Sequence, residues 1–374
     1  VLARHRGNLC LEAARLGHGV ALERRADDCA RRERLPEVLA LQDLPALARA
    51  PRAYAQHAAI GWFSAAQWIH DHLSGYTAEQ LRYRRLSSMV RDYLELSRPK
   101  DWVKNVFVFM PVPFALASGA QLDLRTFGLG LLGFCAANSA VYAFNDAQDA
   151  SRDRAHEKKR NRPVASGRIA ERHAYLWSLA LALLSVLVSW ASGRSSALIV
   201  VGIYVAVNMV YSLGAKHVPL LDVFLLSSGF LLRVLLGCVL MDTPPSNPML
   251  LCSYALALFL ALAKRRADVI RGLDESHRPS LLGYNEAFLD QAMAITGSMA
   301  VVGYALYSLE STVLIPQRKF ASLPFVLFGI LDYLRLAHVQ KRGGSPVDLL
   351  LSSPAMLGTG LGWLLAVIWS VRLP

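Results

Sequence analysis

From about residue 100 onward, long apolar stretches alternate with short polar connections. Each stretch is long enough to cross a hydrocarbon core about 30 Å thick, which takes roughly 20 helical residues. Inside lipid, every backbone N–H and C=O group must form its hydrogen bonds within the protein, as it does in a helix. A membrane-spanning strand would need only about ten residues of alternating polarity, so these longer apolar stretches favour helices. The pattern predicts an all-α fold, a polytopic membrane protein with a bundle of nine transmembrane helices, and argues against a soluble helical protein. The predicted spans are 102–120, 126–145, 174–192, 196–213, 219–241, 248–264, 287–308, 320–338 and 355–373.

Residues 1–92 differ from this pattern. They contain no apolar run long enough to span a membrane and no signal-peptide pattern. The basic residues up to position 88 are all Arg, and the first Met of the chain is Met89, directly before the organised sequence. We therefore expect an N-terminal, non-membrane extension of unknown role over 1–92 and a transmembrane domain over 93–374. Three readings of 1–88 stay open: a cytoplasmic extension, a stretch upstream of a true start at Met89, or the remnant of a fusion partner.

Composition and charge narrow the class of protein. The chain is 54% hydrophobic and 18% charged, whereas average soluble chains carry about 25% charged residues. These values exclude a disordered, collagen-like or disulfide-stapled chain. The five cysteines show no metal-binding spacing, so we interpret them as small core residues. The net charge of +12 is compatible with nucleic acid, an anionic membrane face or a phosphate-rich substrate.

The positions of the cations explain part of this charge. Lys and Arg gather in alternate connections, whereas the intervening connections hold few of them. By the positive-inside rule, the N-terminus and the basic connections are cytoplasmic, which predicts a multi-pass protein of the cell inner (cytoplasmic) membrane with its active site on the cytoplasmic side. No nucleic-acid-binding motif is present in the sequence, so we expect the lipid bilayer and no nucleic acid as partners. The basic connections are 146–173, 265–286 and 339–354.

The first candidate site is the segment NDAQDASRD, residues 145–153. Asn145, Asp149 and Asp153 recur at i, i+4 and i+8, so they share one helix face, with Asp146 beside them. Stacked carboxylates repel one another unless a cation neutralises them. Mg²⁺ is bound by one or two carboxylates together with water and substrate phosphates. The segment therefore predicts a Mg²⁺ site made by all four residues, and the alternative is a solvated helix end paired with the following Arg and Lys.

Charged residues inside the apolar stretches form a second candidate site. Tyr211 and Lys216 stand at one helix exit, Asp222 lies three residues into the next stretch, and Arg233 lies deep within it. Each intramembrane charge costs roughly 2.5–3.5 kcal/mol on insertion scales, so these side chains must face a polar interior. A structural Asp–Arg pair is the alternative, although Asp222 and Arg233 lie eleven residues apart on one helix and cannot pair with each other.

Further cations flank the same cytoplasmic face. Lys264, Arg265 and Arg266 end the sixth predicted span, where a stop-transfer cluster is the alternative reading, and Lys104 and Asn105 stand at the mouth of the first. Arg binds phosphate bidentately and Lys acts as a point charge, so a cationic wall opposite the carboxylates suits a magnesium-bound diphosphate. The candidate substrate-binding residues are Lys104, Asn105, Arg160, Arg162, Tyr211, Lys216, Arg233, Lys264, Arg265 and Arg266.

The motif NDxxDxxxD, its continuation RNRPVASG and the nine predicted spans resemble the UbiA superfamily of intramembrane prenyltransferases over about residues 93–374. The segments RPKDWVKNVFVF, LLDVFLLSSGFLLR, LALAKRRAD and LGYNEAFLDQ are most similar to its decaprenyl-phosphate phosphoribosyltransferase branch. Typical members resemble one another in a second DxxxD, but here Asp268 is followed four residues later by Gly272. The neighbouring cations would suit a donor with an additional phosphate, such as phosphoribosyl diphosphate.

The resemblance implies a Mg²⁺-dependent membrane transferase. It would move a 5-phosphoribosyl group from phosphoribosyl diphosphate to a polyprenyl phosphate, in a branch whose product feeds cell-envelope glycans. Asp146, Asp149 and Asp222 are the implied catalytic residues. Prenyl transfer from a prenyl diphosphate to an aromatic or other acceptor is the alternative reaction, and a transporter is the alternative class. A homo-oligomer is left open.

Overall fold

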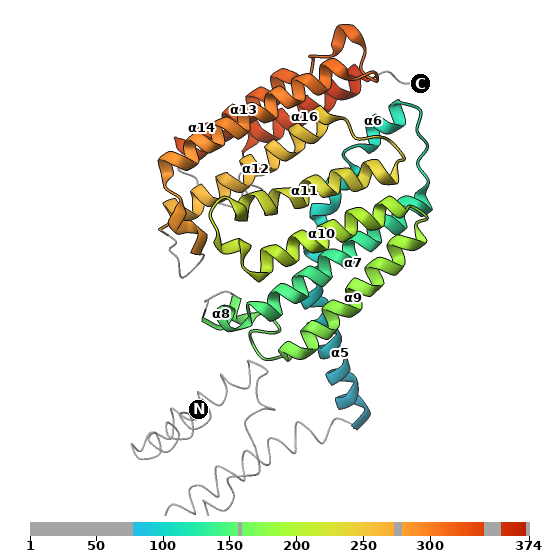
Figure 1. The fold of residues 1–374 in the computed structure, drawn as a ribbon, viewed down its shortest axis with the longest axis vertical. Helices are drawn as coiled ribbons and strands as arrows, with labels where there is room; N and C mark the ends of the chain where they lie inside the picture. The colour runs from blue at the N-terminus through green and yellow to red at the C-terminus, as the bar shows by residue number, and fades with distance from the viewer. Residues whose placement is uncertain (1–77, 156–158, 273–278, 340–352, 372–374) are drawn as a thin grey trace, which may run out of the picture. The chain divides into compact units, whose positions relative to one another are not determined.

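The computed structural model describes residues 78–155, 159–272, 279–339 and 353–371. In these ranges, helices are joined by turns and loops, and one isolated bridge links Leu314 and Val371. Leu86–Pro374 forms one compact unit (Figure 1). Most of the predicted extension over 1–92 lies outside the described residues. The helices, with 3-10 helices marked η, are α5 Ala78–Ser97, η2 Pro99–Phe109, α6 Val112–Ala117, α7 Leu124–Gln148, α8 Ala150–Ala155, η3 Lys159–Asn161, α9 Glu171–Ala191, α10 Ser195–Leu213, η4 Ala215–His217, α11 Leu221–Leu240, α12 Asn247–Ile270, η5 Pro279–Gly283, α13 Glu286–Glu310, η6 Pro316–Arg318, α14 Leu323–His338 and α16 Pro354–Ser370.

Seven segments of the described chain are long and apolar enough to cross a membrane, and they match seven of the predicted spans. The helix α16, predicted as the ninth span, is apolar but shorter. The predicted span 102–120 is wrong as a single helix, because the chain forms η2 and α6 with a break at Met110 and Pro111. Proline lacks the N–H for an intrahelical bond and clashes with the preceding turn, so Pro111 and Pro113 stop one continuous helix from forming.

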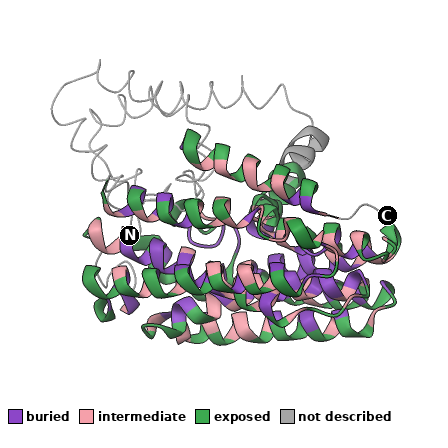
Figure 2. Ribbon diagram, turned by 90° about the horizontal axis from the view of Figure 1, so that it is seen from above, coloured by how far each residue is buried: buried purple, intermediate pink, exposed green. Residues whose placement is uncertain are grey.

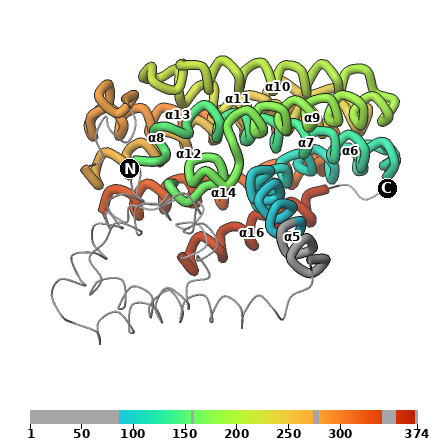
Figure 3. The backbone as a smooth tube through the Cα atoms, turned by 90° about the horizontal axis from the view of Figure 1, so that it is seen from below, coloured from blue at the N-terminus to red at the C-terminus, as the bar shows by residue number. Residues whose placement is uncertain are grey.

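The spanning helices of the bundle pack in a simple series. Helix α9 contacts α7, α7 contacts α10, and the series continues through α11, α12, α13 and α14 to α16. Figure 3 shows α9 and α10 at one edge of the bundle, with α14 and α16 at the other. The 3-10 helix η2 packs against both α7 and α11 in the interior. This places the mouth of the first predicted span beside the carboxylate-bearing end of α7.

The outward faces of the helices carry large apolar side chains. On α9, Leu176, Leu179, Leu183 and Leu187 are each more than half exposed, and Figure 2 shows exposed positions along the outer helices with buried ones between them. Soluble monomers rarely expose contiguous apolar surface of this extent, so the faces are suited to lipid.

Gly237 permits the close approach of η2 to α11. A Cβ at this position would lie 2.1 Å from the carbonyl oxygen of Val108, a backbone atom that cannot turn aside. We expect Gly237→Ala to destabilise the protein by about 1–3 kcal/mol through overpacking, measured as a lower thermal unfolding temperature in detergent. Gly202→Ala on α10, where nothing lies within 4 Å of the added atom, is the matched control and should unfold near the wild-type temperature. Equal unfolding temperatures for the two variants would contradict this account of the packing.

Candidate active site

The carboxylates of the motif lie where α7 passes into α8. Asp149 is the C-cap of α7, and backbone bonds of 2.9 Å from Asp149 N to Asn145 O and from Asp153 N to Asp149 O carry the helical path through the junction. Asp146 and Asp153 are buried, whereas the side chain of Asp149 is 20% exposed. The backbone therefore stays close to helical through the motif, and Asp149 is the most accessible of the three carboxylates.

Each carboxylate of this cluster bonds a cation of the same chain. Arg162 Nη1 donates to Asp146 Oδ1 at 3.1 Å and to Asp153 Oδ2 at 2.6 Å. Lys216 Nζ donates to both oxygens of Asp149 at 2.6 and 2.7 Å and lies 3.3 Å from Asn145 Oδ1. The latter contacts join η4 to α7, which brings together residues far apart in the sequence.

Arg98 is a member of this cluster that the sequence reasoning missed. Its Nη2 donates to Asp146 Oδ1 at 2.5 Å, and its guanidinium lies 5.1 Å from the ring centre of Tyr142. The predicted Lys104 lies over the same ring at 5.7 Å and bonds Asp101 at 2.6 Å. Arg98 has a φ of 49°, in the left-handed region, where α5 ends and Pro99 follows. An Arg directly before Pro at a helix end was the available signal.

Asp222 lies at the start of α11 and is fully buried. Arg265 Nε donates to its Oδ2 at 2.8 Å, Ser280 Oγ donates to the same oxygen at 3.0 Å, and Tyr284 OH donates to Oδ1 at 2.6 Å. Ser280 and Tyr284 were not candidates from the sequence. Both oxygens of Asp222 already accept hydrogen bonds and the side chain is buried, so Asp222 is placed to hold its neighbours in position and not to contact a substrate.

The hydroxyl of Tyr284 also stabilises an unusual backbone. It accepts a hydrogen bond from Leu220 N at 2.6 Å, and Leu220 has a φ of 65°. Burial, followed by the hydrogen bond to Asp222, raises the pKa of Tyr284, so this hydroxyl keeps its proton. Such strained residues persist only where their surroundings hold them. Tyr211 lies near the end of α10, and η4, which carries Lys216, contacts α10, α11 and η5, so the two candidate sites are neighbours.

Arg233 has partners of a different kind. Its Nε donates to Asn105 Oδ1 at 3.0 Å and its Nη2 donates to Asn138 Oδ1 at 2.6 Å. The guanidinium also lies 5.3 Å from the ring centres of Phe134 and Tyr204. The predicted residues Arg233 and Asn105 are therefore hydrogen-bonded to each other. Their contacts link η2, α7 and α11 inside the bundle and do not include the carboxylate cluster.

The remaining predicted cations separate into two groups. Arg266 is buried and bonds Asp290, Glu286 and the carbonyl oxygen of Ala337, so its donors are used between α12, α13 and α14. Lys264 and Arg160 are exposed. These exposed cations can reach a ligand, whereas Arg265 and Arg266 have structural partners.

The carboxylate cluster fits a divalent cation that shares a phosphate ligand. Within the described ranges, no group of three His, Cys, Asp or Glu side chains converges as a complete metal site. Asp146 and Asp153 nevertheless reach the same nitrogen of Arg162, so a single cation position lies between them. Mg²⁺ needs only one or two carboxylates when phosphates and waters complete its shell.

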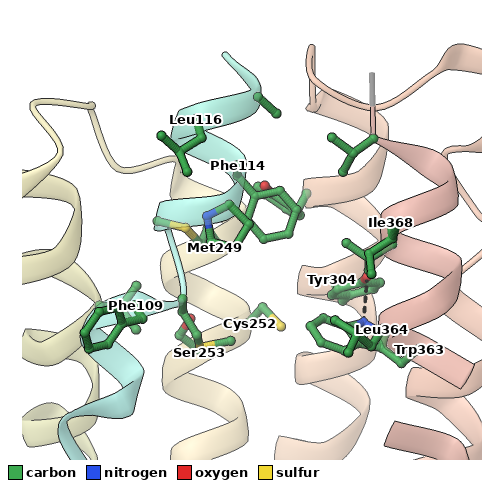
Figure 4. A pocket seen from close by; sticks show the side chains of 17 residues that line it. Phe109, Phe114, Leu116, Met249, Cys252, Ser253, Tyr304, Trp363, Leu364 and Ile368 are labelled. Carbon is green, nitrogen blue, oxygen red and sulfur yellow. Dashed lines mark hydrogen bonds between the residues drawn. The ribbon is translucent and has the colours of Figure 1, made fainter. Parts of the chain in front are cut away.

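An apolar cavity of about 520 Å³ lies in the other half of the bundle. Its walls come from η2, α6, α11, α12, α13 and α16, as Figure 4 shows in part, with Met249 and Cys252 on α12. Trp363 Nε1 donates to Tyr304 OH at 2.9 Å across one wall. The twelve residues from Cys252 to Lys264 span about 18 Å along α12. The apolar cavity and the charged site therefore lie at different levels along α12.

Comparison with known proteins identifies the family of this chain. Residues 105–342 match the model of the UbiA prenyltransferase family. The decaprenyl-phosphate phosphoribosyltransferase of Corynebacterium glutamicum is 33% identical over 284 residues, 73% of this chain and 85% of that protein. The protein of the same name from Mycobacterium tuberculosis is 30% identical over 289 residues, 75% of this chain and 94% of that protein. The structure of a UbiA homolog from Archaeoglobus fulgidus bound to DMAPP and Mg²⁺ has a TM-score of 0.58 at 19% identity, covering 74% of this chain and 97% of that one. The chain belongs to the UbiA prenyltransferase family and is a membrane transferase.

Proposed function

We propose that the protein transfers a 5-phosphoribosyl group from phosphoribosyl diphosphate to a polyprenyl phosphate and releases diphosphate. The observation that carries this proposal is the cluster of Asp146, Asp149 and Asp153 faced by Arg98, Arg162 and Lys216. Such a cluster can hold a metal-bound diphosphate through both of its charges. The two relatives named decaprenyl-phosphate phosphoribosyltransferase support the choice of donor and acceptor.

The end of α12 also supports this donor. Gly272 has a φ of 68° and follows the C-cap residue Arg271, so α12 ends where a second DxxxD would need its second carboxylate. Exposed Lys264 lies four residues before Asp268, on the same face of α12. A donor with an additional phosphate gains from a cation at this position, whereas a prenyl diphosphate with a second magnesium would need the carboxylate.

The roles of the residues follow from their geometry. Asn145, Asp146, Asp149 and Asp153 would hold Mg²⁺, which neutralises charge on the leaving diphosphate when it is bound. Lys104, Arg160, Arg162 and Lys264 would bind phosphates, and Tyr211 and Lys216 would orient the ribose and leaving group. Five residues would position these groups, because they are buried and bond partners outside the carboxylate cluster: Asp222, Arg265, Arg266, Arg233 and Asn105.

The reaction needs positioning more than acid–base catalysis. A phosphate oxygen of the acceptor forms a bond to C1 of the ribose as the bond from C1 to the diphosphate oxygen breaks. The acceptor phosphate is already ionised at neutral pH, so no strong general base is required. Holding the two reactants in line and stabilising the leaving charge in a site that excludes water supplies most of the rate enhancement.

The apolar cavity would receive part of the acceptor's isoprenoid chain. Ser253 lines it from α12, and its side chain is labelled in Figure 4. We expect Ser253→Trp to raise the KM for polyprenyl phosphate by about tenfold or more, because the indole fills space that the chain needs, while the affinity for phosphoribosyl diphosphate is unchanged. Steady-state kinetics with varied lipid and equilibrium binding of the donor measure the two effects. Ser253→Ala should behave as wild type, and an unaltered lipid KM in the Trp variant would place the chain elsewhere.

We also propose that the protein is a multi-pass protein of the cytoplasmic membrane, with its N-terminus and active site on the cytoplasmic side. The charge bias of the connections supports this orientation. Membrane-impermeant thiol labelling of single cysteines introduced at exposed Arg160 and Arg125 would test it, since the two positions should react from opposite sides.

Prenyl transfer from a prenyl diphosphate is the second candidate function. The family's name and the DMAPP-bound neighbour favour it.

The proposed phosphoribosyl transfer is tested by measuring the release of diphosphate from phosphoribosyl diphosphate by the detergent-purified protein. This release should depend on polyprenyl phosphate and should be abolished by a chelator. Absence of diphosphate release with wild-type protein and Mg²⁺ would reject it.

A further inference from the structure

The cations of the chain already neutralise the carboxylate cluster. Arg98 and Arg162 bond Asp146, Arg162 also bonds Asp153, and Lys216 bonds Asp149. Lys159 Nζ lies 4.0 Å from Asp153 Oδ1. Three carboxylates therefore meet four cations of the chain. A divalent cation that enters alone adds to this positive charge, whereas one that enters with a polyphosphate brings negative charge with it.

Arg162 has the geometry of a cation that can exchange its partner. Its Nη1 alone bonds both Asp146 and Asp153, which are almost fully buried, while its own side chain is 27% exposed. Within the described part of the chain, its Nε and Nη2 make no hydrogen bond to a neighbouring side chain. The same guanidinium can therefore hold the carboxylates with one nitrogen and present a free fork to a phosphate.

We propose that Arg162 is an exchangeable internal counter-ion that couples magnesium binding to donor binding. It lies in the cation position between Asp146 and Asp153, competes there with Mg²⁺, and moves to a donor phosphate when metal and donor enter together. This inference rests on the proposed function for the identity of the donor. Because coupling between two ligands is reciprocal, the donor must strengthen Mg²⁺ binding by the same factor by which Mg²⁺ strengthens donor binding.

Removing the Arg162 charge should change the two affinities in opposite directions. In titration calorimetry of the full-length protein without donor, we expect Arg162→Gln to bind Mg²⁺ roughly fivefold or more tightly than wild type, within the range of typical couplings. At saturating Mg²⁺ the same variant should bind phosphoribosyl diphosphate at least about tenfold more weakly. A group needed only for folding would weaken both. Equal or weaker Mg²⁺ binding by folded Arg162→Gln would overturn the proposal.

Two further variants make the result decisive. Arg98→Gln removes the second cation on Asp146 and should also tighten Mg²⁺ binding, which keeps the test available if Arg162→Gln does not fold. Arg154→Gln removes the same charge from an exposed pair with Glu171 on the same connection and should leave both affinities as in wild type. Tightening by Arg154→Gln equal to that by Arg162→Gln would show a general charge effect and reject the exchange. If wild type binds no phosphoribosyl diphosphate at any Mg²⁺ concentration, the proposed donor is wrong, whereas the Mg²⁺ comparison still decides the role of Arg162.

Discussion

Replacing Asp149 by Asn should lower the rate of phosphoribosyl transfer by about 10²–10³-fold, the usual loss when one preorganised electrostatic group is removed. Asp149 is the most open carboxylate of the cluster, and both of its oxygens face Lys216. The amide keeps the shape but loses the charge and one acceptor oxygen, so it can hold neither the metal nor Lys216 equally well. Initial rates with labelled donor at saturating Mg²⁺ measure the effect.

The control for this variant lies at the other end of the same helix. Asp123 is the N-cap of α7 and accepts hydrogen bonds from Arg125 N and Thr126 Oγ1. Because Asn caps helices about as well as Asp, Asp123→Asn should keep wild-type activity. Turnover by Asp149→Asn within twofold of wild type would remove the carboxylate cluster from the mechanism.

Replacing Asp222 by Asn should have the largest effect on stability. Its partner Arg265 is 1% exposed and would keep only its longer, 3.4 Å contact with the more exposed Asp268 as a counter-charge. Removing one member of a buried ion pair costs about 3–5 kcal/mol, and Tyr284 and Ser280 would in addition lose a charged acceptor. We expect a large fall in the thermal unfolding temperature in detergent, followed by tryptophan fluorescence.

A surface pair provides the comparison. Asp242 bonds Arg194 at 2.9 Å with its side chain 73% exposed, so Asp242→Asn should change the free energy of unfolding by only about 0–1 kcal/mol. Asn also tolerates the positive φ at this position. Combining Asp222→Asn with Arg265→Met should cost less than the sum of the single changes. Strictly additive losses would mean that the pair is not the source of the stability.

Much of the fold was predictable because lipid imposes simple rules on sequence. Long apolar runs predicted the positions of seven spans, and the spacing of Asn145, Asp149 and Asp153 predicted the helical backbone that joins them. The break within 102–120 lies at Pro111, a residue that the apolar character of its neighbours conceals. Hydropathy averages over a window and so conceals a single residue that lacks a backbone donor.

The site was predictable in its residue types but not in its pairings. The sequence excluded a pair between Asp222 and Arg233 from their separation, yet the true partner, Arg265, lies 43 residues away on another helix. Contacts of this kind depend on how helices pack, which no local pattern encodes. For the same reason Arg266 was grouped with phosphate-binding residues, although it bonds Asp290 on α13. Buried cations acquire protein partners, whereas exposed ones such as Lys264 stay available to a ligand.

The identity of the donor is decided by comparing two donors with one preparation of purified protein and Mg²⁺. One reaction contains labelled phosphoribosyl diphosphate and a polyprenyl phosphate, and the other contains a labelled prenyl diphosphate and a hydroxybenzoate. We expect a labelled lipid product in the first reaction, no prenylated benzoate in the second, and loss of the first product in Asp149→Asn. A prenylated benzoate together with no labelled phosphoribosyl lipid would contradict this expectation.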